Sequence, residues 1–253
     1  MMHLSTKWKR ISYRARQWGW KRVALVIGRA AIDTFWYWAW DLWHGVETRK
    51  EVALRELGIE GACYGDDPET YTYSGWNGDY SCASRKFPER LNRLNLNWNS
   101  FAYVDLGSGK GKSLLMAAEL PFKKVIGVEI SPKLVHTAQE NLLSRKHFHL
   151  RCEDIEVVLQ DASTYDFPPY PLVTYSLNTF PPAIMRVVLE RLRRSLQENP
   201  REAYLISTPT SPEIESLFSE CGFLTLVDSG PSHQTYRAVI SAEHCKWISQ
   251  SVS

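Results

Sequence analysis

Three acidic side chains stand where they could bind a small cationic ligand, because each follows a short apolar run with the composition of a buried strand. Asp105 and Glu129 are the last residues of two such runs, and Asp161 follows a third run by two residues. In an open sheet of parallel strands, ligands bind beyond the carboxyl ends of the strands. We therefore expect these three carboxylates to gather at one edge of a sheet.

A glycine turn follows the first of these acids directly. The sequence Asp-Leu-Gly-Ser-Gly-Lys-Gly at 105–111 places Gly107, Gly109 and Gly111 at alternate positions, and a helical pattern begins at the next residue. Glycine adopts positive φ angles without steric cost and lets the backbone approach a ligand closely. A strand, a glycine turn and a helix in this order indicate a nucleotide-type pocket.

Three kinds of ligand fit such a turn in principle. Gly111-Lys112-Ser113 resembles the end of a P-loop. That motif has four residues between its two glycines, so its first glycine would have to be residue 106, which is a leucine here. A dinucleotide fingerprint would need two residues between its second and third glycines, whereas only Lys110 separates Gly109 from Gly111. The run 105–111 resembles at every position the turn of class I S-adenosylmethionine methyltransferases, in which an acid precedes Gly-x-Gly-x-Gly by two places. An acid suits a cationic sulfonium and ammonium group, whereas it would repel a pyrophosphate.

This resemblance implies a role for each acid. Glu129 lies eighteen residues beyond Gly111, and a carboxylate about twenty residues after a glycine turn commonly accepts hydrogen bonds from ribose hydroxyls. In the same superfamily an acid at the place of Asp161 faces the adenine amino group. The predicted S-adenosylmethionine site therefore comprises Asp105, Gly107, Ser108, Gly109, Gly111, Glu129, Asp161 and Ala162.

The alternation of apolar runs and helical patterns from residue 101 onward predicts an α/β fold. We expect a Rossmann-like, seven-stranded, mostly parallel sheet with one antiparallel strand, plus an N-terminal helical extension. The last two strands are joined by Gly230-Pro231-Ser232 and are predicted to form a hairpin. The predicted strands are 101–106, 124–130, 155–160, 171–177, 202–207, 223–228 and 235–241, and the predicted helices after residue 101 are 112–119, 132–147, 182–197 and 211–221.

Residues 44 to 208 resemble a largely uncharacterised family of bacterial class I methyltransferases. The resemblance is carried by His44 to Thr48, Glu56 to Ile59, Val104 to Gly111 and Pro121 to Pro132. Members of that family have a Tyr-x-Pro-Thr/Ser element that helps to close the cofactor site, and its counterpart here starts at Tyr80, without the proline. The resemblance thus adds Tyr80 to the predicted cofactor site.

The methyl acceptor is expected beside the end of the fourth strand. The run Asn178-Thr179-Phe180 resembles the Asn-Pro-Phe of the same family and the Asn-Asn-Phe of lysine methyltransferases of the disruptor-of-silencing type. Asn178 could hold an amine or hydroxyl through its side-chain carbonyl, and Phe180 could form a wall. We assign both as catalytic candidates, favour a nitrogen acceptor such as a protein lysine or small amine, and expect no metal, since no Cys/His cluster occurs.

The N-terminal region has a different character from the rest of the chain. Residues 1–32 contain eight Lys or Arg and no acid, and seven of the ten tryptophans lie in the first 43 residues. Such a segment could bind an anionic membrane surface, bind nucleic acid, or pack on the catalytic domain. We predict a basic, tryptophan-rich helical extension at 1–43, a connector and lid at 44–100 and the methyltransferase domain at 101–253. We expect a cytoplasmic protein, which would be peripheral at a membrane surface if its extension binds anionic lipids.

Two functions of other classes stay open at this point. A non-catalytic sensor could bind S-adenosylmethionine without using it. A P-loop-like nucleotide hydrolase would need the lysine and serine after Gly111 to serve a phosphate and its magnesium ion.

Overall fold

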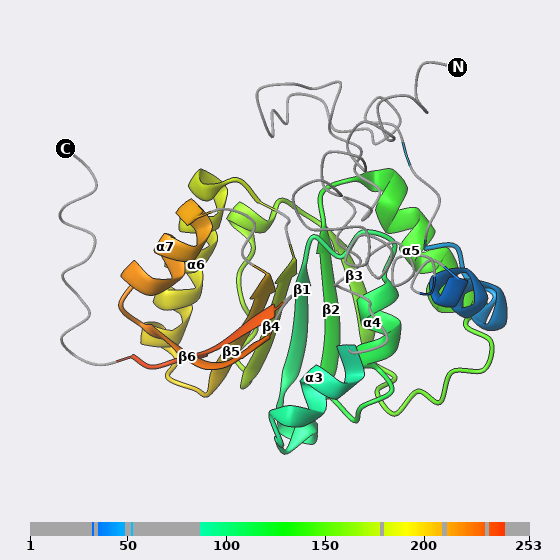
Figure 1. The fold of residues 1–253 in the computed structure, drawn as a ribbon, viewed down its shortest axis with the longest axis horizontal. Coiled ribbons are helices and arrows are strands. Elements are labelled where there is room, and N and C mark those ends of the chain that lie inside the picture. The colour runs from blue at the N-terminus through cyan, green and yellow to red at the C-terminus, as the bar shows by residue number, and fades with distance from the viewer. Residues whose placement is uncertain are drawn as a thin grey trace, which may run out of the picture.

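The computed structural model describes residues 32, 35–48, 52, 87–177, 180–208, 212–230 and 233–240. Within these residues a single seven-stranded sheet crosses the molecule in the order β3-β2-β1-β4-β5-β7-β6 (Figure 1). The strands are β1 (Ala102–Leu106), β2 (Lys124–Glu129), β3 (Ile155–Leu159), β4 (Leu172–Leu177), β5 (Ala203–Thr208), β6 (Leu224–Gly230) and β7 (His233–Ala238).

The first five strands are parallel, and β7 is antiparallel to both of its neighbours. The chain moves outward from β1 to β3 and then returns to pair β4 with the other side of β1. This reversal of strand order between β1 and β4 is the place where open α/β sheets bind ligands. The predicted fold, including the single reversed strand in a terminal hairpin, is confirmed.

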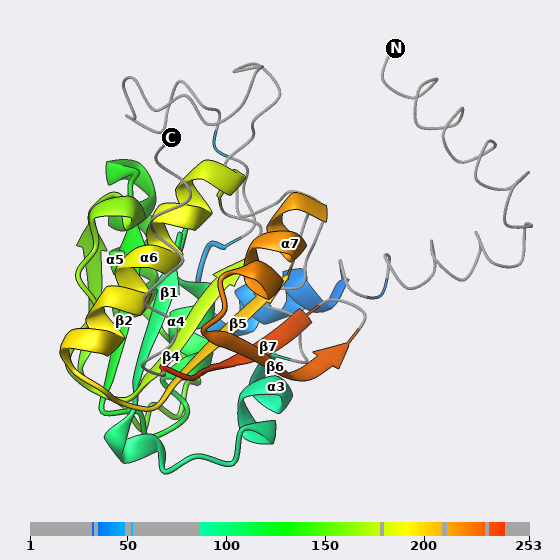
Figure 2. The same ribbon diagram turned by 90° about the vertical axis from the view of Figure 1, so that its left-hand side faces the viewer.

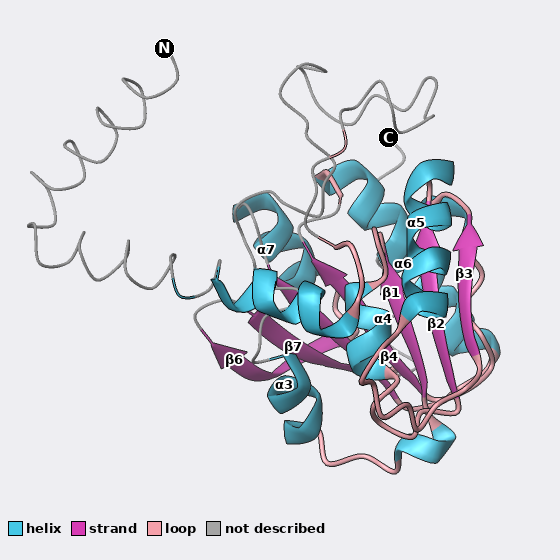
Figure 3. Ribbon diagram, turned by 90° about the vertical axis from the view of Figure 1, so that its right-hand side faces the viewer, coloured by secondary structure: helices cyan, strands magenta, loops and turns pink. Residues whose placement is uncertain are grey.

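Helices cover both faces of the sheet (Figure 2, Figure 3). Each strand-to-strand crossover among the parallel strands is right-handed by strong preference, so the change of direction after β3 places later helices on the opposite face from earlier ones. The elements that cover the sheet are α3 (Phe87–Arg93), α4 (Lys112–Ala117), α5 (Pro132–Ser144), α6 (Pro182–Glu198) and α7 (Pro212–Glu220), with short 3-10 turns η2 (Trp98–Ser100) and η3 (Ala162–Thr164).

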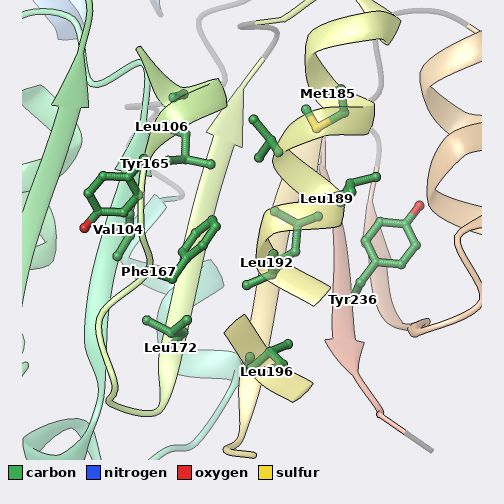
Figure 4. Packing of buried hydrophobic residues seen from close by; sticks show 14 of the residues in the cluster. Val104, Leu106, Tyr165, Phe167, Leu172, Met185, Leu189, Leu192, Leu196 and Tyr236 are labelled. Atoms are coloured by element: carbon green, nitrogen blue, oxygen red, sulfur yellow. The ribbon is translucent and has the colours of Figure 1, made fainter. Parts of the chain in front are cut away.

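The core under α6 and α7 is largely aliphatic (Figure 4). Leu189, Leu192 and Leu196 recur along α6 at helical spacing and are almost fully buried against the sheet. Tyr165 and Phe167, which follow η3, close the same core near β1. This packing covers the face of the sheet under α6 and α7. The carboxyl ends of the strands lie outside this core, at one edge of the sheet.

The core on the other face is aromatic. The ring of Phe87 in α3 contacts Tyr103 and Tyr175 edge-on, at centroid distances of 6.1 and 5.2 Å. Trp98 and Phe122 pack in the same way at 4.9 Å. Because aromatic pairs bury large areas in preferred orientations, they anchor α3 and the loop before β1 against the middle of the sheet.

The element boundaries agree with the sequence prediction to within a few residues. Ser131 caps α5, since its hydroxyl accepts a hydrogen bond from the Leu134 amide and Pro132 occupies the first turn. One feature of the last hairpin escaped the prediction: the pairing of β6 with β7 shifts between Leu226 and Asp228, which is a β-bulge.

The predicted N-terminal helix is described in part. Residues 35–44 are helical and lie beside α4 and α5 (Figure 1, blue). Residues 1–31, 33 and 34 of the predicted extension and residues 49–51 and 53–86 of the predicted connector and lid lie outside the described residues.

Candidate active site

The glycine turn after β1 has the backbone conformation that its sequence requires. Gly107, Gly109 and Gly111 have φ angles of 82°, 54° and 78°, which residues with a Cβ atom adopt only at a cost. The amides of Gly107 and Ser108 both donate to the carbonyl oxygen of Val128, at 2.8 and 3.1 Å. The turn is thus held against the end of β2, next to Glu129.

Two glycines show which side of the turn is filled and which is open. A Cβ atom on Gly127 of β2 would lie 2.6 Å from both the Leu114 side chain and the Ser108 hydroxyl, so the turn packs directly on this strand. A Cβ atom on Gly109 would have no heavy atom of the described residues within 4 Å. Only glycine satisfies the close approach at residue 127, whereas the space beside Gly109 is available to a ligand.

Glu129 connects β2 to this turn. Its carboxylate accepts one hydrogen bond from the Gly109 amide and one from the Ser131 amide, both at 2.9 Å. The side chain is buried, and burial raises the pKa of this carboxyl while the backbone N–H groups lower it. The Ile130 amide also acts on this carboxylate. Since a carboxylate has about four acceptor positions, capacity remains for a hydroxyl group of a ligand.

Asp105 is the second buried acid. Its carboxylate accepts a hydrogen bond from the Ser113 hydroxyl at the start of α4. Burial, together with the nearby Glu129 and against the effect of the Ser113 bond, raises the pKa of Asp105 to about 7. A cation bound near this pair would favour the ionised form of both acids.

Asp161 and Ala162 lie beyond the end of β3. The Asp161 side chain caps η3 by accepting a hydrogen bond from the Ser163 amide at 2.8 Å, and Ala162 is buried. Because β3 pairs with β2 in register at Glu129, the three predicted acids follow three adjacent strands at one edge of the sheet. The predicted juxtaposition of their strand ends is therefore present.

The two lysines of the turn are bound by acids from the N-terminal segment. Lys110 forms an ion pair with Glu47 and is almost completely buried. Lys112 Nζ lies 3.4 Å from Asp41, and both of these side chains are about nine-tenths buried. These acids balance the positive charge of the lysines next to the turn.

The lysine–acid pairs belong to a larger contact between residues 35–48 and the sheet domain. Asn141 of α5 exchanges hydrogen bonds with the backbone of Glu47 and also donates to the Lys110 carbonyl. The Lys112 ammonium lies over the rings of Tyr37 and Trp40, at 4.5 and 4.1 Å. The part of this segment from Tyr37 to Glu47 therefore packs beside the glycine turn.

These contacts also bear on the P-loop alternative. In a P-loop the lysine and serine after the last glycine serve the phosphate and its magnesium ion. Here Lys112 is engaged by Asp41 and Ser113 by Asp105. Both residues that a phosphate would need already bind carboxylates.

The acceptor side is described less fully. Asn178 and Tyr80 lie outside the described residues, whereas Phe180 is partly buried and packs against the aliphatic core. At the end of β4, the hydroxyl of Ser176 is buried and has no hydrogen-bond partner among the described residues. Ser176 lies beside Ser207 of β5 in the sheet register.

The histidines are mostly occupied with structural contacts. His44 stacks on Phe148 at 3.9 Å and His147 stacks on Trp43 at 4.4 Å. His136 pairs with Glu140 on the exposed side of α5. His233, at the start of β7, lies 3.1 Å from Asp228 and is buried in the terminal hairpin.

Comparison with known families decides the class of domain. Residues 104–199, from β1 to the end of α6, match a family described as a methyltransferase domain. This segment is therefore similar to a methyltransferase domain. This match agrees with the predicted methyltransferase class.

Individual relatives are more distant. The chain is 36% identical over 134 residues to an "Uncharacterized RNA methyltransferase" of Chlamydia caviae, a match that covers 50% of this chain and 29% of that relative. Among solved structures, magnesium protoporphyrin IX methyltransferase from Synechocystis, crystallised with S-adenosylmethionine, has 17% identity and a TM-score of 0.46, with 61% of this chain and 76% of that chain covered. A methyltransferase from Methanosarcina mazei has 12% identity and a TM-score of 0.45, with 60% and 98% covered.

The described part of the chain offers neither a metal site nor a membrane span. It contains no group of three or more His, Cys, Asp or Glu side chains placed to hold a metal ion. It also contains no helix that is both long and apolar enough to cross a bilayer.

Sequence reasoning missed the residues that support the turn from a distance. Asp41, Glu47 and Asn141 contact the turn across 71, 63 and 31 residues of chain. No local pattern marks such partners. The one available signal was the lysine pair itself, because buried lysines need acidic partners.

Proposed function

We propose that this protein is an S-adenosylmethionine-dependent methyltransferase that acts on a nitrogen acceptor. The observation that carries the proposal is the space beside Gly109 that the described residues leave open. It adjoins the buried carboxylate of Glu129, which lies near Asp105, at the switch point of the sheet. Buried acids without a salt-bridge partner are costly, and a cationic cofactor relieves that cost.

In this proposal the residues at the carboxyl ends of β1, β2 and β3 each bind a different part of the cofactor. Asp105 and the backbone of Gly107, Ser108, Gly109 and Gly111 hold the methionine portion. Glu129 accepts hydrogen bonds from the ribose, and Asp161 with Ala162 borders the adenine ring, while Tyr80 helps to close the site. When bound, S-adenosylmethionine supplies a methyl group on a positively charged sulfur.

The charges around the turn support a cationic ligand over an anionic one. Lys110 and Lys112 are neutralised by Glu47 and Asp41, so the net local charge comes from Asp105 and Glu129. A phosphate would meet these two acids without a free lysine to balance them. The protein residues therefore favour a sulfonium and an ammonium group.

Methyl transfer is an in-line displacement that needs alignment and removal of water more than acid–base chemistry. We assign Asn178 to hold the acceptor nitrogen through its side-chain carbonyl and Phe180 to exclude water beside it. The acceptor is a protein lysine or a small amine. RNA is a second candidate, and the name of the Chlamydia relative is the observation that favours it.

The test of the cofactor assignment is the variant Glu129→Gln. The amide cannot accept the same hydrogen bonds as a carboxylate, so we expect S-adenosylmethionine binding measured by calorimetry to weaken by about 1–3 kcal/mol. Glu198→Gln, at the exposed end of α6, is the matched control and should bind like the wild type. Wild-type affinity in Glu129→Gln would refute the ribose assignment.

The test of the activity uses labelled methyl groups and cell extract separated into protein, lipid, RNA and small-molecule fractions. Label in one fraction that depends on Glu129 identifies the acceptor class. Tight cofactor binding with no transfer to any fraction would instead support a sensor, and binding of ATP with magnesium but not of S-adenosylmethionine would support the hydrolase.

A further inference from the structure

The helix of residues 35–44 has two apolar faces, of which only one is covered. Phe35, Trp38, Leu42 and Trp43 follow each other at helical spacing on its outer face. Their exposed fractions are 66%, 52%, 67% and 62%. A row of large apolar side chains this exposed is unusual on a protein surface and marks a place of interaction.

The opposite face of this helix fixes its orientation. Tyr37 and Asp41 are buried, and Asp41 binds both Lys112 and the backbone and hydroxyl of Thr48. Trp40 packs on Phe148 at 5.5 Å. Because the inner face is anchored to the sheet domain, the exposed apolar side chains lie on the face turned away from the domain.

Basic residues from the loop after α5 lie near the C-terminal end of this helix. Trp43 stacks on His147, and the aliphatic stem of Lys146 lies 3.1 Å from the position of a Cβ atom on Gly45. Arg145, the residue before Lys146, is exposed. Preceding the helix, residues 1–32 carry eight Lys or Arg and no acid.

We propose that the outer face of helix 35–44 binds the surface of an anionic lipid bilayer. Tryptophan and phenylalanine insert at the boundary between headgroups and acyl chains, and lysine and arginine attract acidic headgroups. The proposal concerns where the enzyme works and goes beyond its methyl transfer.

An RNA partner fits this face less well than a lipid surface. Proteins bind RNA through cations interleaved with the aromatic rings on which bases stack. Residues 35–44 contain no Lys or Arg, and their one carboxylate, Asp41, faces the domain. An aliphatic side chain such as Leu42 in the same row is suited to acyl chains.

The test is cosedimentation of the full chain with vesicles of phosphatidylcholine alone or with a third phosphatidylglycerol. We expect binding to the anionic vesicles that weakens with added salt, and little binding to the neutral ones. The variant Trp38→Ser/Leu42→Ser should lower the partition coefficient about tenfold, since each side chain loses burial in the bilayer. Val187→Ser/Val227→Ser, which removes exposed apolar side chains on α6 and β6, is the control and should bind as the wild type does.

Unfolding curves and S-adenosylmethionine binding check that the variant remains folded. Equal vesicle binding by Trp38→Ser/Leu42→Ser and the wild type would overturn the proposal. So would binding of a labelled single-stranded RNA that depends on Trp38 and Leu42 in the absence of any vesicle binding.

Discussion

The glycine turn after β1 and the end of β4 lie at the same edge of the sheet, but they are held in different ways. The turn is bonded to Val128 and Glu129 of β2, to Asn141 of α5 and to acids of the segment 35–48. At the end of β4, the Ser176 hydroxyl is buried without a hydrogen-bond partner among the described residues. The Ser108 hydroxyl of the turn is also buried without a described partner, so the two halves differ in the number of contacts from other elements that hold their backbone and charged groups.

This difference matches the division between donor and acceptor sites that the proposed transferase activity requires. The donor half binds one ligand, so every residue around it can be fixed by its neighbours. Preorganisation of this kind lowers the entropic cost of binding. The acceptor half has fewer fixed contacts, and the identity of the acceptor is therefore harder to derive from its side chains.

The largest expected effect comes from filling the covered side of the turn with Gly127→Val. Its side chain would collide with Leu114 and Ser108, and we expect the free energy of unfolding in urea to fall by about 3 kcal/mol. Gly109→Ala is the matched variant on the open side, where only the positive φ angle costs about 1 kcal/mol. If the cofactor occupies that space, Gly109→Ala loses at least about tenfold in cofactor affinity; an unchanged affinity would contradict the site.

The second effect concerns the long-range support of the turn. Asp41→Ala leaves Lys112 buried without this partner and removes two hydrogen bonds to Thr48. We expect a loss of about 2 kcal/mol in the free energy of unfolding and weaker cofactor binding. Asp166→Ala breaks an exposed pair with Arg191 and should cost less than about 0.5 kcal/mol. Equal effects of the two variants would show that the N-terminal contact does not stabilise the turn.

The third effect is a pH dependence. Because the pKa of Asp105 is raised to about 7, the folded apo protein retains a proton that the unfolded chain releases near pH 4. Stability from this group is therefore full below about pH 4 and is lost as the pH rises toward about 7. A cationic cofactor prefers the ionised acid, so its affinity should rise about tenfold between pH 6 and pH 8. Asp105→Asn should remove the pH dependence of the free energy of unfolding and that of the cofactor affinity measured by calorimetric titration. If both pH dependences are unchanged in this variant, Asp105 is excluded as their source.

The smallest effect compares one serine from each half. Ser176→Ala removes a buried hydroxyl without a described partner, so the free energy of unfolding should change by less than about 0.5 kcal/mol. Ser131→Ala removes the cap of α5 and should cost about 1 kcal/mol. If Ser176 faces the acceptor, its variant also lowers the transfer rate while cofactor affinity is unchanged. A stability loss larger than that of Ser131→Ala would mean that Ser176 has a structural partner.

The sequence predicted the fold well because its signals are local. Alternating apolar runs, the cap at Ser131 and the spacing of the glycines each depend on a few neighbouring residues. The position of Glu129 could be inferred for the same reason, since it ends a strand. Its hydrogen bonds to Gly109 and Ser131 could not, because they depend on how two loops meet.

The N-terminal segment shows where such reasoning stops. Its tryptophans and its charge are plain in the sequence, but the lysines that pair with Asp41 and Glu47 lie beyond residue 100. Which tryptophans face the domain and which face outward is decided by that contact. Of three interpretations open for this region, packing against the domain is observed for residues 35–48, while the partners proposed for residues 1–32 stay predictions.

The bulge in β6 has a consequence for how this protein behaves at high concentration. β6 is an edge strand, and its Leu226 and Val227 are half exposed. A regular edge with such side chains is a template on which a strand of another molecule can add. The break in pairing between Leu226 and Asp228 twists this edge, so the exposed strand is a poor template for growth of an extended intermolecular sheet.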